Sequence, residues 1–427
     1  MNIVECAAAF LQSLCALAGR TAWDWQQCPW CGSTLTIKHG SYQRRPWFLE
    51  GREVVRVQRH RCHGCGRTYS EQSALLIRGG WYAREVRRAA VDHWQHGGLS
   101  LRRTAEVLRS WMGHQERWLQ WRPWATEMGE RCYLTASTVQ RWLDRAGQQA
   151  QASVAGQLRS IGSAQVLGTD GLWVKLRGKA RRVVLLVVDS VSGLIYPPVV
   201  AAGEESAAPW RRLFGRAQQA GLDLDAVRGV TSDGAVGLLD YLRRSLGWVH
   251  HQRCVWHVWR KVGQEIARAG RQAAEGLSAE AARQVRRQVR AELRSLVRPI
   301  VDAQSYVEAE AAVAHLQAHA YGAAIAQFLN ELLDALLVYR LAYCQGLQRI
   351  TPEWYWRDFR LRLSHGRNQC SDQRLERAAL VWAIYHNFEP AQWRCERKRH
   401  YRHPGQSALQ AAGAPPGQLS YLDALGV

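Results

Sequence analysis

The sequence lacks any run of about 18 uninterrupted apolar residues, the length that a membrane-spanning helix needs. The segment 1–20 is mildly apolar, but no basic stretch precedes it, so we expect no secretory signal. Acidic residues are scarce: 36 Asp and Glu stand against 57 Lys and Arg, a formal charge of +21. This excess predicts a polyanionic partner, DNA or RNA, because each neutralised phosphate releases counterions. A codon bias toward Arg, Ala and Gly is the alternative explanation.

The eleven Cys are an odd number, which argues against a disulfide framework and favours metal binding in a reducing cytoplasm. Four of them form two Cys-x-x-Cys pairs, and a glycine follows each pair: Cys28, Cys31, Cys62 and Cys65. Glycine allows the tight turn that brings both thiolates of a pair toward one ion. The pattern predicts a closed structural Zn²⁺ site of four thiolates, a zinc ribbon. Two unrelated, redox-active pairs are the alternative.

Residues 81–150 show a helical pattern, with Ser100 as the expected N-cap of one helix. A second helix is expected from the segment 134–143, where a polar cap precedes polar and basic residues, as in a recognition helix. The Trp-rich stretch 109–133 separates them more than a standard helix-turn-helix would, so a plain helical connector is the alternative. The small and polar segment 147–163 is interpreted as a linker.

From residue 164 the chain alternates apolar and helical patterns. The expected strands are 165–174, 182–189, 194–200, 227–232 and 249–254, and the expected helices are 206–220 and 238–246. Three hairpin-linked strands followed by helix, strand, helix and strand is the order of a ribonuclease-H-like sheet. Asp189 is interpreted as a residue of the hairpin turn.

Residues 258–350 consist almost entirely of helix formers. Within them, five arginines recur at steps of three and four residues, with apolar residues on the opposite side, which predicts an amphipathic helix. These arginines are Arg283, Arg287, Arg290, Arg294 and Arg298. A solvated face and a face that binds DNA phosphates remain equally open. The segment is interpreted as an all-α insertion, after which the sheet domain resumes with a helix from Asp372 to Phe388.

Two aspartates stand where the chemistry of a metal centre is expected. Asp170 lies inside an apolar strand, where a carboxylate is costly to bury without a partner, and Asp233 ends another strand. Strand ends that meet at one edge of a sheet form α/β sites. With a third carboxylate from a helix, they can hold two Mg²⁺ ions about 4 Å apart. Glu376 is our choice for the third, and Asp358 and Glu331 are its competitors.

Three segments carry a family resemblance: Thr169–Asp170–Gly171, Thr231 to Ala235 (TSDGA) and His251 to Lys261 (HQRCVWHVWRK). Together they resemble Mutator-like and related bacterial insertion-sequence transposases of the DDE class. In that family the second Asp lies in a Ser-Asp-Gly segment, followed by Gln-Arg-Cys-x-x-His, an all-α insertion and the final Glu. The family often has Asn three or four residues before that Glu, whereas this chain has Asp372.

The resemblance implies metal-dependent phosphoryl transfer without a covalent protein intermediate, with Mg²⁺ or Mn²⁺ as cofactor. Asp170, Asp233 and Glu376 take the catalytic roles, and Cys254 and His257 form the family's Cys-x-x-His pair. From the residues alone, Cys254 and His257 lie one helical turn apart and can bind a metal, contact DNA, brace the site, or be merely buried. The resemblance further implies double-stranded DNA as partner, a homo-oligomer on DNA and a place at the bacterial nucleoid in the cytoplasm.

The expected fold is a multidomain α/β protein with a zinc ribbon, a helical DNA-binding region and a ribonuclease-H-like core that carries an all-α insertion. The expected parts are an N-terminal helix at 1–27, the zinc ribbon at 28–75, the helix-turn-helix-like region at 80–150, the core at 160–262 and 351–390, the insertion at 263–350 and a basic tail at 391–427. The resemblance makes the ribbon and helical region the readers of terminal repeats, with candidate contacts at Arg102, Arg103, Thr138, Gln140 and Arg141.

Three other functions compete with this interpretation. A transposase-derived DNA-binding regulator without activity would share the N-terminal parts, but the presence of three carboxylates argues against it. His257 and Arg260 match the His-x-x-Arg of tyrosine recombinases, yet those enzymes are helical around the site and need no metal. A ribonuclease-H-like nuclease that cuts without joining is separated from a transposase only by the family resemblance.

Overall fold

The computed structural model describes most of the chain. The described residues are 27–71, 75–77, 79–112, 134–158, 164–178, 180–341, 356–357, 359–360, 362–363, 371–389, 405–414 and 420–427. Residues 1–26 of the expected helix at 1–27, most of the Trp-rich stretch and the basic residues 394–400 lie outside them. The chain divides into two compact units, residues 1–145 with Val427 and residues 146–426. Among the described residues, no helix is long and apolar enough to cross a membrane.

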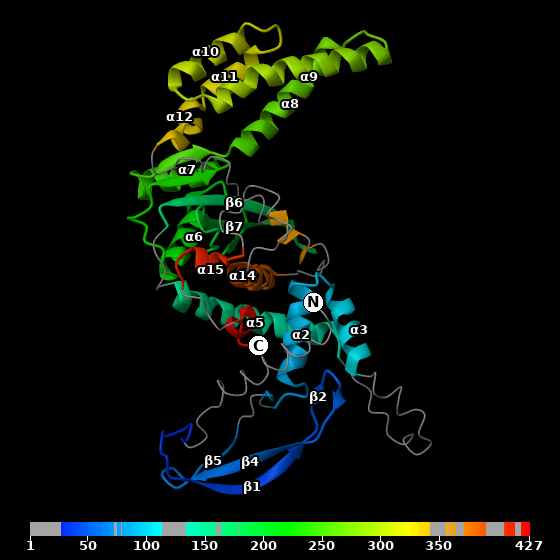
Figure 1. Ribbon diagram of the computed structural model, residues 1–427, viewed down its shortest axis with the longest axis vertical. Coiled ribbons are helices and arrows are strands. Elements are labelled where there is room, and N and C mark those ends of the chain that lie inside the picture. Colours follow the sequence, from blue (N-terminus) through cyan, green and yellow to red (C-terminus); the bar gives the residue numbers. More distant parts are fainter. Residues whose placement is uncertain are drawn as a thin grey trace. The chain divides into compact units, whose positions relative to one another are not determined.

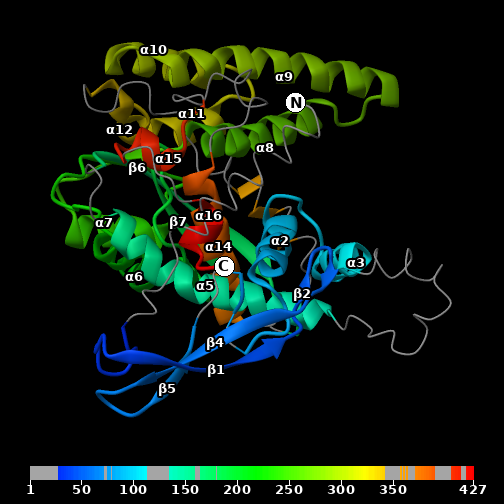
Figure 2. The same cartoon turned by 60° about the horizontal axis from the view of Figure 1, so that its bottom comes forward.

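The first unit begins with short antiparallel strands (Figure 1). They are β1 (Thr36–Arg44), β2 (Trp47–Phe48), β3 (Gly51–Arg52), β4 (Val55–Cys62) and β5 (Thr68–Ser70). β4 lies between β1 and β5, while β2 and β3 form a separate hairpin. Figure 2 shows the three strands side by side. The core of these strands is a small cluster of Phe48, Val57, Leu76 and Ala83, so the sheet buries little apolar area.

Three helices complete the first unit and lead out of it: α2 (Arg84–Gln95), α3 (Leu101–Met112) and α5 (Ala136–Leu158). The predicted cap of α3 is confirmed, because the Arg103 amide donates to Ser100 Oγ at 3.2 Å. α5 begins in the same way, with the Thr138 amide donating to Thr135 Oγ1 at 3.3 Å. The Arg109 guanidinium on α3 donates to the Leu134 carbonyl at 3.1 Å, which fixes the start of α5 against α3.

The predicted linker at 147–163 is wrong for its first twelve residues, because α5 continues without a break to Leu158. Residues 159–163 lie outside the described part. The segment is rich in Ala and Gln, which are good helix formers, so its small and polar character does not break the helix. Gly147 has a packing role: a Cβ at this position would lie 2.8 Å from the Arg377 backbone. The glycine therefore permits close approach of two chain segments.

The second unit is built on a five-stranded mixed sheet. Its strands are β6 (Val166–Lys175), β7 (Arg181–Asp189), β8 (Val199–Ala201), β9 (Gly229–Ser232) and β10 (His250–Arg253), in the order β10-β9-β6-β7-β8. The first three strands pair antiparallel, whereas β6, β9 and β10 run parallel to one another. Two helices, α6 (Ala207–Gln219) and α7 (Val236–Ser245), provide the crossovers that parallel strands require. The predicted order of strands and helices is confirmed.

The turn after β7 also follows the prediction. Asp189 Oδ1 accepts from the Val191 amide at 3.0 Å, and Gly193 takes a positive φ of 80°. The third strand is shorter than expected, beginning at Val199, although Ile195 forms an isolated bridge to Val188. Pro197 and Pro198 lie between, and proline cannot donate a ladder hydrogen bond, which explains the interruption.

Helix α14 (Asp372–Phe388) covers one face of this sheet. Its buried Leu375 and Trp382 pack in one core with Leu172 of β6 and Leu186 of β7. Asn387 holds the C-terminal end of α14 to the segment that follows β7. Its side chain accepts a hydrogen bond from the Ile195 amide and donates one to the Ile195 carbonyl, both at 2.8 Å. The expected return of the chain to the sheet through this helix is confirmed. Two short helices follow, α15 (Ala408–Ala411) and α16 (Tyr421–Ala424).

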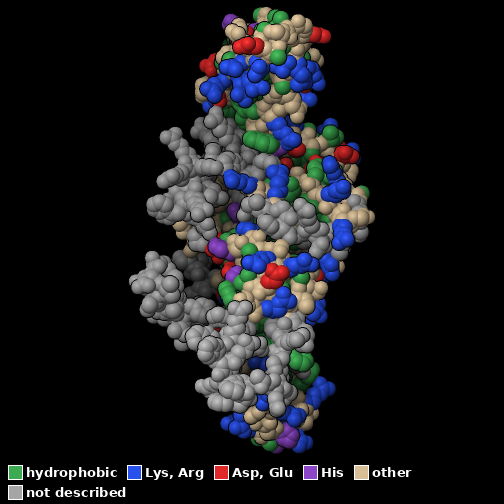
Figure 3. Space-filling view, turned by 90° about the vertical axis from the view of Figure 1, so that its right-hand side faces the viewer, with side chains coloured by type: hydrophobic (Ala, Val, Ile, Leu, Met, Phe, Trp, Pro, Cys, Tyr) green, Lys and Arg blue, Asp and Glu red, His purple; other side chains and the backbone are tan. Residues whose placement is uncertain are grey.

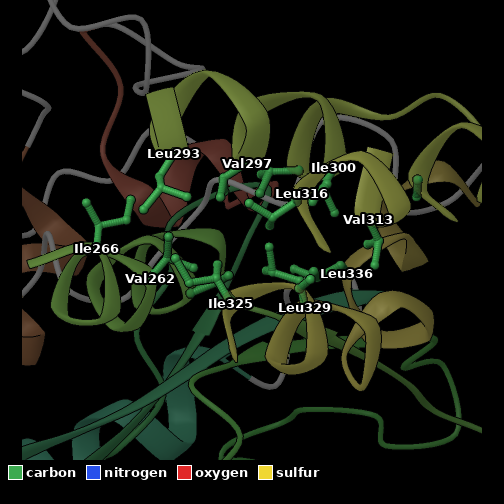
Figure 4. Packing of buried hydrophobic residues seen from close by; sticks show 14 of the residues in the cluster. Val262, Ile266, Leu293, Val297, Ile300, Val313, Leu316, Ile325, Leu329 and Leu336 are labelled. Carbon is green, nitrogen blue, oxygen red and sulfur yellow. The ribbon is translucent and has the colours of Figure 1, made fainter. Parts of the chain in front are cut away.

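Every regular element described between Val255 and Arg340 is helical, as predicted. These are α8 (Val255–Ala273), α9 (Ala279–Asp302), α10 (Tyr306–Gln317), α11 (Ala323–Asn330), α12 (Leu333–Leu336) and a 3-10 turn (Val338–Arg340). They enclose their own apolar core, in which Val262, Leu293, Leu316 and Leu329 face one another (Figure 4). On α9 the five arginines of the predicted stripe are exposed, opposite the buried Leu293, so the amphipathic pattern is confirmed.

Candidate active site

Asp170 and Asp233 meet because of the register of two parallel strands. Gly168 of β6 pairs with Thr231 of β9, so two residues further along each strand Asp170 and Asp233 come level. His257, in the first turn of α8, approaches the same point. One ligand atom from each of the three residues lies within 4.8 Å of the others. Asp170 is buried, and Asp233 and His257 are half-buried.

The turn that presents Asp233 is held by backbone hydrogen bonds. Asp233 Oδ1 accepts from the Ala235 amide at 3.0 Å, and Ser232 Oγ accepts from the Gly234 amide at 2.9 Å. His251 Nε2 lies 2.7 Å from the same Ser232 Oγ. Burial lowers the pKa of His251 to about 4, so the imidazole is neutral at pH 7. The Asp233 carboxylate is therefore oriented by backbone amides, the Ser232 hydroxyl and the neutral His251 imidazole, none of which is charged.

Arg253 closes this turn from the neighbouring strand, and our sequence analysis did not single it out. A Cβ added at Gly234, whose φ is +81°, would collide with the Arg253 guanidinium. Burial lowers the pKa of Arg253, and the negative charge of Asp233 opposes that shift. The only signal in the sequence was its place in the segment from His251 to Lys261.

The Cys-x-x-His pair divides into two roles. Cys254 is buried at the N-terminus of α8, and its amide donates to the Ser232 carbonyl at 2.7 Å, which ties α8 to β9. Burial raises the pKa of the Cys254 thiol to about 11, so it is protonated at neutral pH and is a weak ligand. His257, one turn further, is the member that joins the two aspartates. Cys254 is thus suited to bracing the site.

Glu204 is a further carboxylate close enough to Asp233 to feel its charge, on the face of β6 opposite to the Asp170 side chain, and our sequence analysis missed it. Its Oε1 accepts from the Trp173 indole at 2.9 Å, and a Cβ added at Gly171 would collide with its Oε2. Burial raises the pKa of Glu204, and the nearby charge of Asp233 raises it further, against the Trp173 hydrogen bond. It follows a strand and precedes a helix in a Gly-Glu-Glu-Ser segment, which no spacing rule marks.

Glu376 occupies a different place from the two aspartates. Its Oε1 forms an ion pair with Arg216 Nη1 at 2.6 Å, and its Oε2 lies 3.5 Å from the Val200 amide of β8. It is not among the described residues whose ligand atoms meet at Asp170 and Asp233. Of its competitors, Glu331 is exposed and accepts from Gln327, and Asp358 lies outside the described residues.

The donors that do meet suit a divalent cation. Carboxylate oxygens are hard ligands of the kind that Mg²⁺ and Mn²⁺ prefer. The imidazole of His257 is a ligand that transition metals favour more than Mg²⁺ does. Two carboxylates and an imidazole within 4.8 Å therefore fit a divalent metal ion, and the cost of burying Asp170 near Asp233 falls when such an ion is bound.

The four cysteines of the first unit also come together. Their sulfur atoms all lie within 4.8 Å of one another, with Cys28 Sγ 3.6 Å from Cys65 Sγ and Cys31 Sγ 3.6 Å from Cys62 Sγ. Four sulfur donors at such distances fit a tetrahedral Zn²⁺ ion. The cluster joins two segments that the sequence separates by about 30 residues, so one ion would fix both.

The two cysteine pairs adopt the same turn. The amides of Gly32 and Gly66 donate at 2.9 Å to the carbonyls of the first cysteines, Cys28 and Cys62, and each glycine has φ +70°. The predicted role of these glycines is confirmed. The Cys65 backbone amide lowers the pKa of the Cys62 thiol to about 7, which favours the thiolate that a metal ligand must be.

The five candidate DNA contacts lie at the starts of α3 and α5. Arg102, Arg103 and Arg141 are exposed, whereas Thr138 and Gln140 are half-buried. Four of them make local contacts: Arg103 with Glu106 at 3.2 Å, Arg141 with Thr138 Oγ1 at 3.1 Å and Gln140 with Asp144 at 3.1 Å. Such exposed contacts are weak and can be exchanged for contacts to a phosphate.

In a comparison with known families, residues 165–350 match the family described as "Transposase, Mutator family". The matched segment contains Asp170, Asp233, Cys254 and His257 but ends before Glu376. No curated protein matches the chain. The resemblance inferred from the sequence is thereby confirmed over this segment.

Proposed function

Since residues 165–350 match the Mutator family of transposases, we propose that this protein is a DDE-type transposase. It cleaves DNA at the ends of its element and transfers the freed strands into target DNA in a metal-dependent reaction. The observation that carries this proposal is the meeting of Asp170, Asp233 and His257 within 4.8 Å inside the matched segment. The sheet order β10-β9-β6-β7-β8, with three antiparallel strands before the parallel ones, supports a ribonuclease-H-like core.

The proposed catalytic metal is Mg²⁺ or Mn²⁺, held by Asp170 and Asp233 with His257 beside them. When bound, such ions activate an attacking hydroxyl and stabilise the leaving oxygen of a phosphodiester. Glu376 remains the proposed third carboxylate, although its ion pair with Arg216 supports a structural role equally well. The contribution of the chain itself is orientation: the hydrogen bonds from Ala235 and Gly234 hold the Asp233 turn in place before DNA arrives.

Basic side chains near these carboxylates are proposed to bind the phosphates of the DNA backbone. Arg253 lies against the Asp233 turn and carries a cation into a half-buried site. Further away, the exposed arginines of α9 form a basic face on the helical part, and Figure 3 shows Lys and Arg side chains gathered there. A DNA duplex carries a dense row of phosphates, which such a face attracts.

The first unit is proposed to recognise the terminal repeats of the element. The four-cysteine cluster is proposed to be a zinc ribbon, in which Zn²⁺ stabilises a small fold and takes no part in catalysis. Arg102, Arg103, Thr138, Gln140 and Arg141 are the proposed contacts to the DNA. Joining two element ends requires two active sites, so a homo-oligomer on double-stranded DNA is proposed, at the bacterial nucleoid in the cytoplasm.

The decisive experiment is strand cleavage and joining on a labelled duplex that carries the element's own ends. The protein is assayed with Mg²⁺ or with EDTA, as wild type and as Asp233→Asn, which keeps the size of the side chain and removes its charge. Metal-dependent products that the variant no longer makes are expected, and joined products distinguish a transposase from a nuclease.

The control is Asp189→Asn, which removes the charge of a strand-end aspartate that serves only the hairpin. It should cleave like the wild type once folded protein is matched by circular dichroism. Tight binding to the ends without cleavage under any divalent metal would refute the enzymatic function and support a DNA-binding regulator derived from a transposase.

A further inference from the structure

Trp256 is an exposed aromatic side chain next to the candidate metal centre. It lies in the first turn of α8, immediately before His257, and 41% of it is exposed. The Trp256 and His257 rings are nearly perpendicular, at 87°, and their centroids lie 4.8 Å apart. Because His257 meets Asp170 and Asp233, the indole lies one side chain away from the point where the cation is proposed to bind.

The apolar core of the helices α8 to α12 does not use this side chain. Its neighbours Val255 and Val258 are buried in that core, and Trp259 packs against it. Helical periodicity places Trp256 on the exposed side of α8, which it shares with Arg260. One exposed apolar residue is common on a protein surface, so its exposure alone indicates no ligand. The charge around it and its place beside His257 narrow the choice.

The charge next to Trp256 is positive. The guanidinium carbon of Arg260, one turn further along α8, lies 5.7 Å from the centre of the Trp256 ring. Arg260 is exposed, and no ion pair joins it to an acidic residue in the part of the chain that the structure describes. By contrast, Lys261 and Arg268 on the same helix both pair with Glu265, at 3.5 Å and 2.7 Å.

An aromatic ring beside an unneutralised cation suits a polyanion that carries aromatic groups, which is nucleic acid. A second copy of this chain fits less well, because it would bring the same cations face to face. In a duplex, however, each base pair is stacked between its neighbours, and the faces of paired bases are covered. Only a base that has left its pair offers a free face, and such a base stacks on an aromatic side chain whatever its identity.

The distance from the metal centre limits which base this is. The Trp256 ring lies next to the His257 ring, whose ligand atom lies within 4.8 Å of the carboxylate oxygens. A DNA strand advances about 3.4 Å per nucleotide, so the indole lies within about three nucleotides of a phosphate bound at that point.

We propose that Trp256 stacks on an unpaired base next to the phosphodiester that is cut, and that Arg260 binds a phosphate beside this base. The inference rests on the proposed function, because it states the form in which the DNA strand reaches that site. Stacking on Trp256 replaces part of the stabilisation that the base loses on leaving the duplex. Trp256 thereby positions the strand, and the residues of the metal centre remain the catalytic ones.

The test compares a fully paired duplex that carries the element's own end with duplexes that contain one mismatch. The mismatch is moved through about three nucleotides on either side of the junction between the element and its flanking DNA. Binding to the full-length, zinc-loaded protein is measured in EDTA by fluorescence anisotropy. A mismatch removes most of the cost of unpairing, so at one position the wild type should bind the mismatched duplex about tenfold more tightly.

Three variants show whether this preference depends on stacking. Trp256→Leu should lose it, because Leu is apolar but has no aromatic face, and Trp256→Phe should keep it. The matched control is Trp248→Leu: Trp248 is 47% exposed but precedes β10, at the end of that strand away from α8. It should keep the wild-type preference. A preference that survives in Trp256→Leu, or a wild type without a preference at any position, would overturn the inference.

Cleavage with Mg²⁺ separates stacking from an indirect effect on His257. Trp256→Leu should cut the paired duplex about tenfold to a hundredfold more slowly, and the mismatch at the preferred position should restore part of that rate. An equal loss on paired and mismatched duplexes, accompanied by weaker Mn²⁺ binding, would mean that Trp256 acts only by positioning His257. That result would also overturn the inference.

The proposed function and this inference can fail separately. If the wild type cuts no duplex under any divalent metal, but its preference for the mismatch depends on Trp256, the stacking is correct and the proposed cleavage fails. If the wild type cuts with Mg²⁺, and Trp256→Leu equals it in binding and cleavage of both duplexes, only the assignment of Trp256 fails.

Discussion

Gly234, the residue after Asp233, is a position at which a single methyl group tests the packing of the proposed site. It has φ +81°, and a Cβ there would collide with the Arg253 guanidinium. Gly276, in the turn between α8 and α9, provides a matched control: its φ is +76°, but a Cβ there meets nothing within 4 Å. Gly276→Ala therefore measures the backbone strain alone, and Gly234→Ala measures the strain plus the displaced arginine.

The two costs can be estimated separately. A left-handed conformation costs an L-residue about 1–2 kcal/mol, and this applies to both variants. Displacement of the half-buried Arg253 adds about 1–3 kcal/mol, the usual range for overpacking. Gly234→Ala should thus lower the free energy of unfolding of the second unit by about 2–5 kcal/mol in total. In a unit of this size each kcal/mol lowers the melting temperature by about 2–4 °C.

The assay is urea or thermal unfolding followed by far-UV circular dichroism, together with DNA cleavage at a temperature where each variant is folded. Gly234→Ala should also lose cleavage, because the turn that presents Asp233 must move, whereas Gly276→Ala should keep it. The double variant Gly234→Ala/Arg253→Ala lacks the guanidinium that the new methyl group would meet. It should therefore recover part of the difference in unfolding free energy between Gly234→Ala and Gly276→Ala. Equal destabilisation by both single variants would refute the assigned contact between Arg253 and Gly234.

Three further predictions concern other parts of the chain. Cys28→Ser should release zinc and unfold the first unit in zinc-free buffer, measured by metal analysis and limited proteolysis; retention of one zinc per chain would contradict the site. His251 has its pKa lowered from 6.5 to about 4, so it contributes stability above pH 6.5 that is lost as the pH falls toward 4. We expect the wild type to lose up to about 3 kcal/mol more than His251→Gln over that interval in urea titrations, and parallel curves would refute this. Leu293→Ala should cost about 2–5 kcal/mol of unfolding free energy, and the exposed Arg290→Ala less than about 0.5 kcal/mol; similar values for both would contradict the burial of Leu293.

The sheet of the second unit could be predicted because its strands are short apolar runs separated by turn residues. Asp189 and Gly193 mark one hairpin, and their turn has the hydrogen bond and the positive φ that these residue types favour. The meeting of Asp170 and Asp233 also followed from the sequence, since residues at the same edge of neighbouring strands must lie close together. Local chemistry and strand register were enough for these features.

Residues that approach from helices were harder to predict. Glu376 has a capped helix and a family resemblance in its favour, yet its carboxylate forms an ion pair with Arg216 of α6. The outcome for Glu376 depends on the path and packing of helices, which no local pattern specifies. The α5 helix was missed for a different reason: its C-terminal half was interpreted as a linker from its small and polar residues, although its Ala and Gln favour a helix.

The amino-acid sequence by itself determined the resemblance to Mutator-family transposases, the two aspartates, the four-cysteine pattern with its glycine turns, and the amphipathic stripe of α9. Each of these depends on residue types at fixed spacings along one chain segment. Only the tertiary structure decided which side chains surround those aspartates. His257 joins them, Arg253 closes over the Gly234 turn and Glu204 lies against Gly171, because separate strands and helices bring these residues together. Such long-range packing is decided by the burial of whole elements, and spacing in the sequence does not encode it.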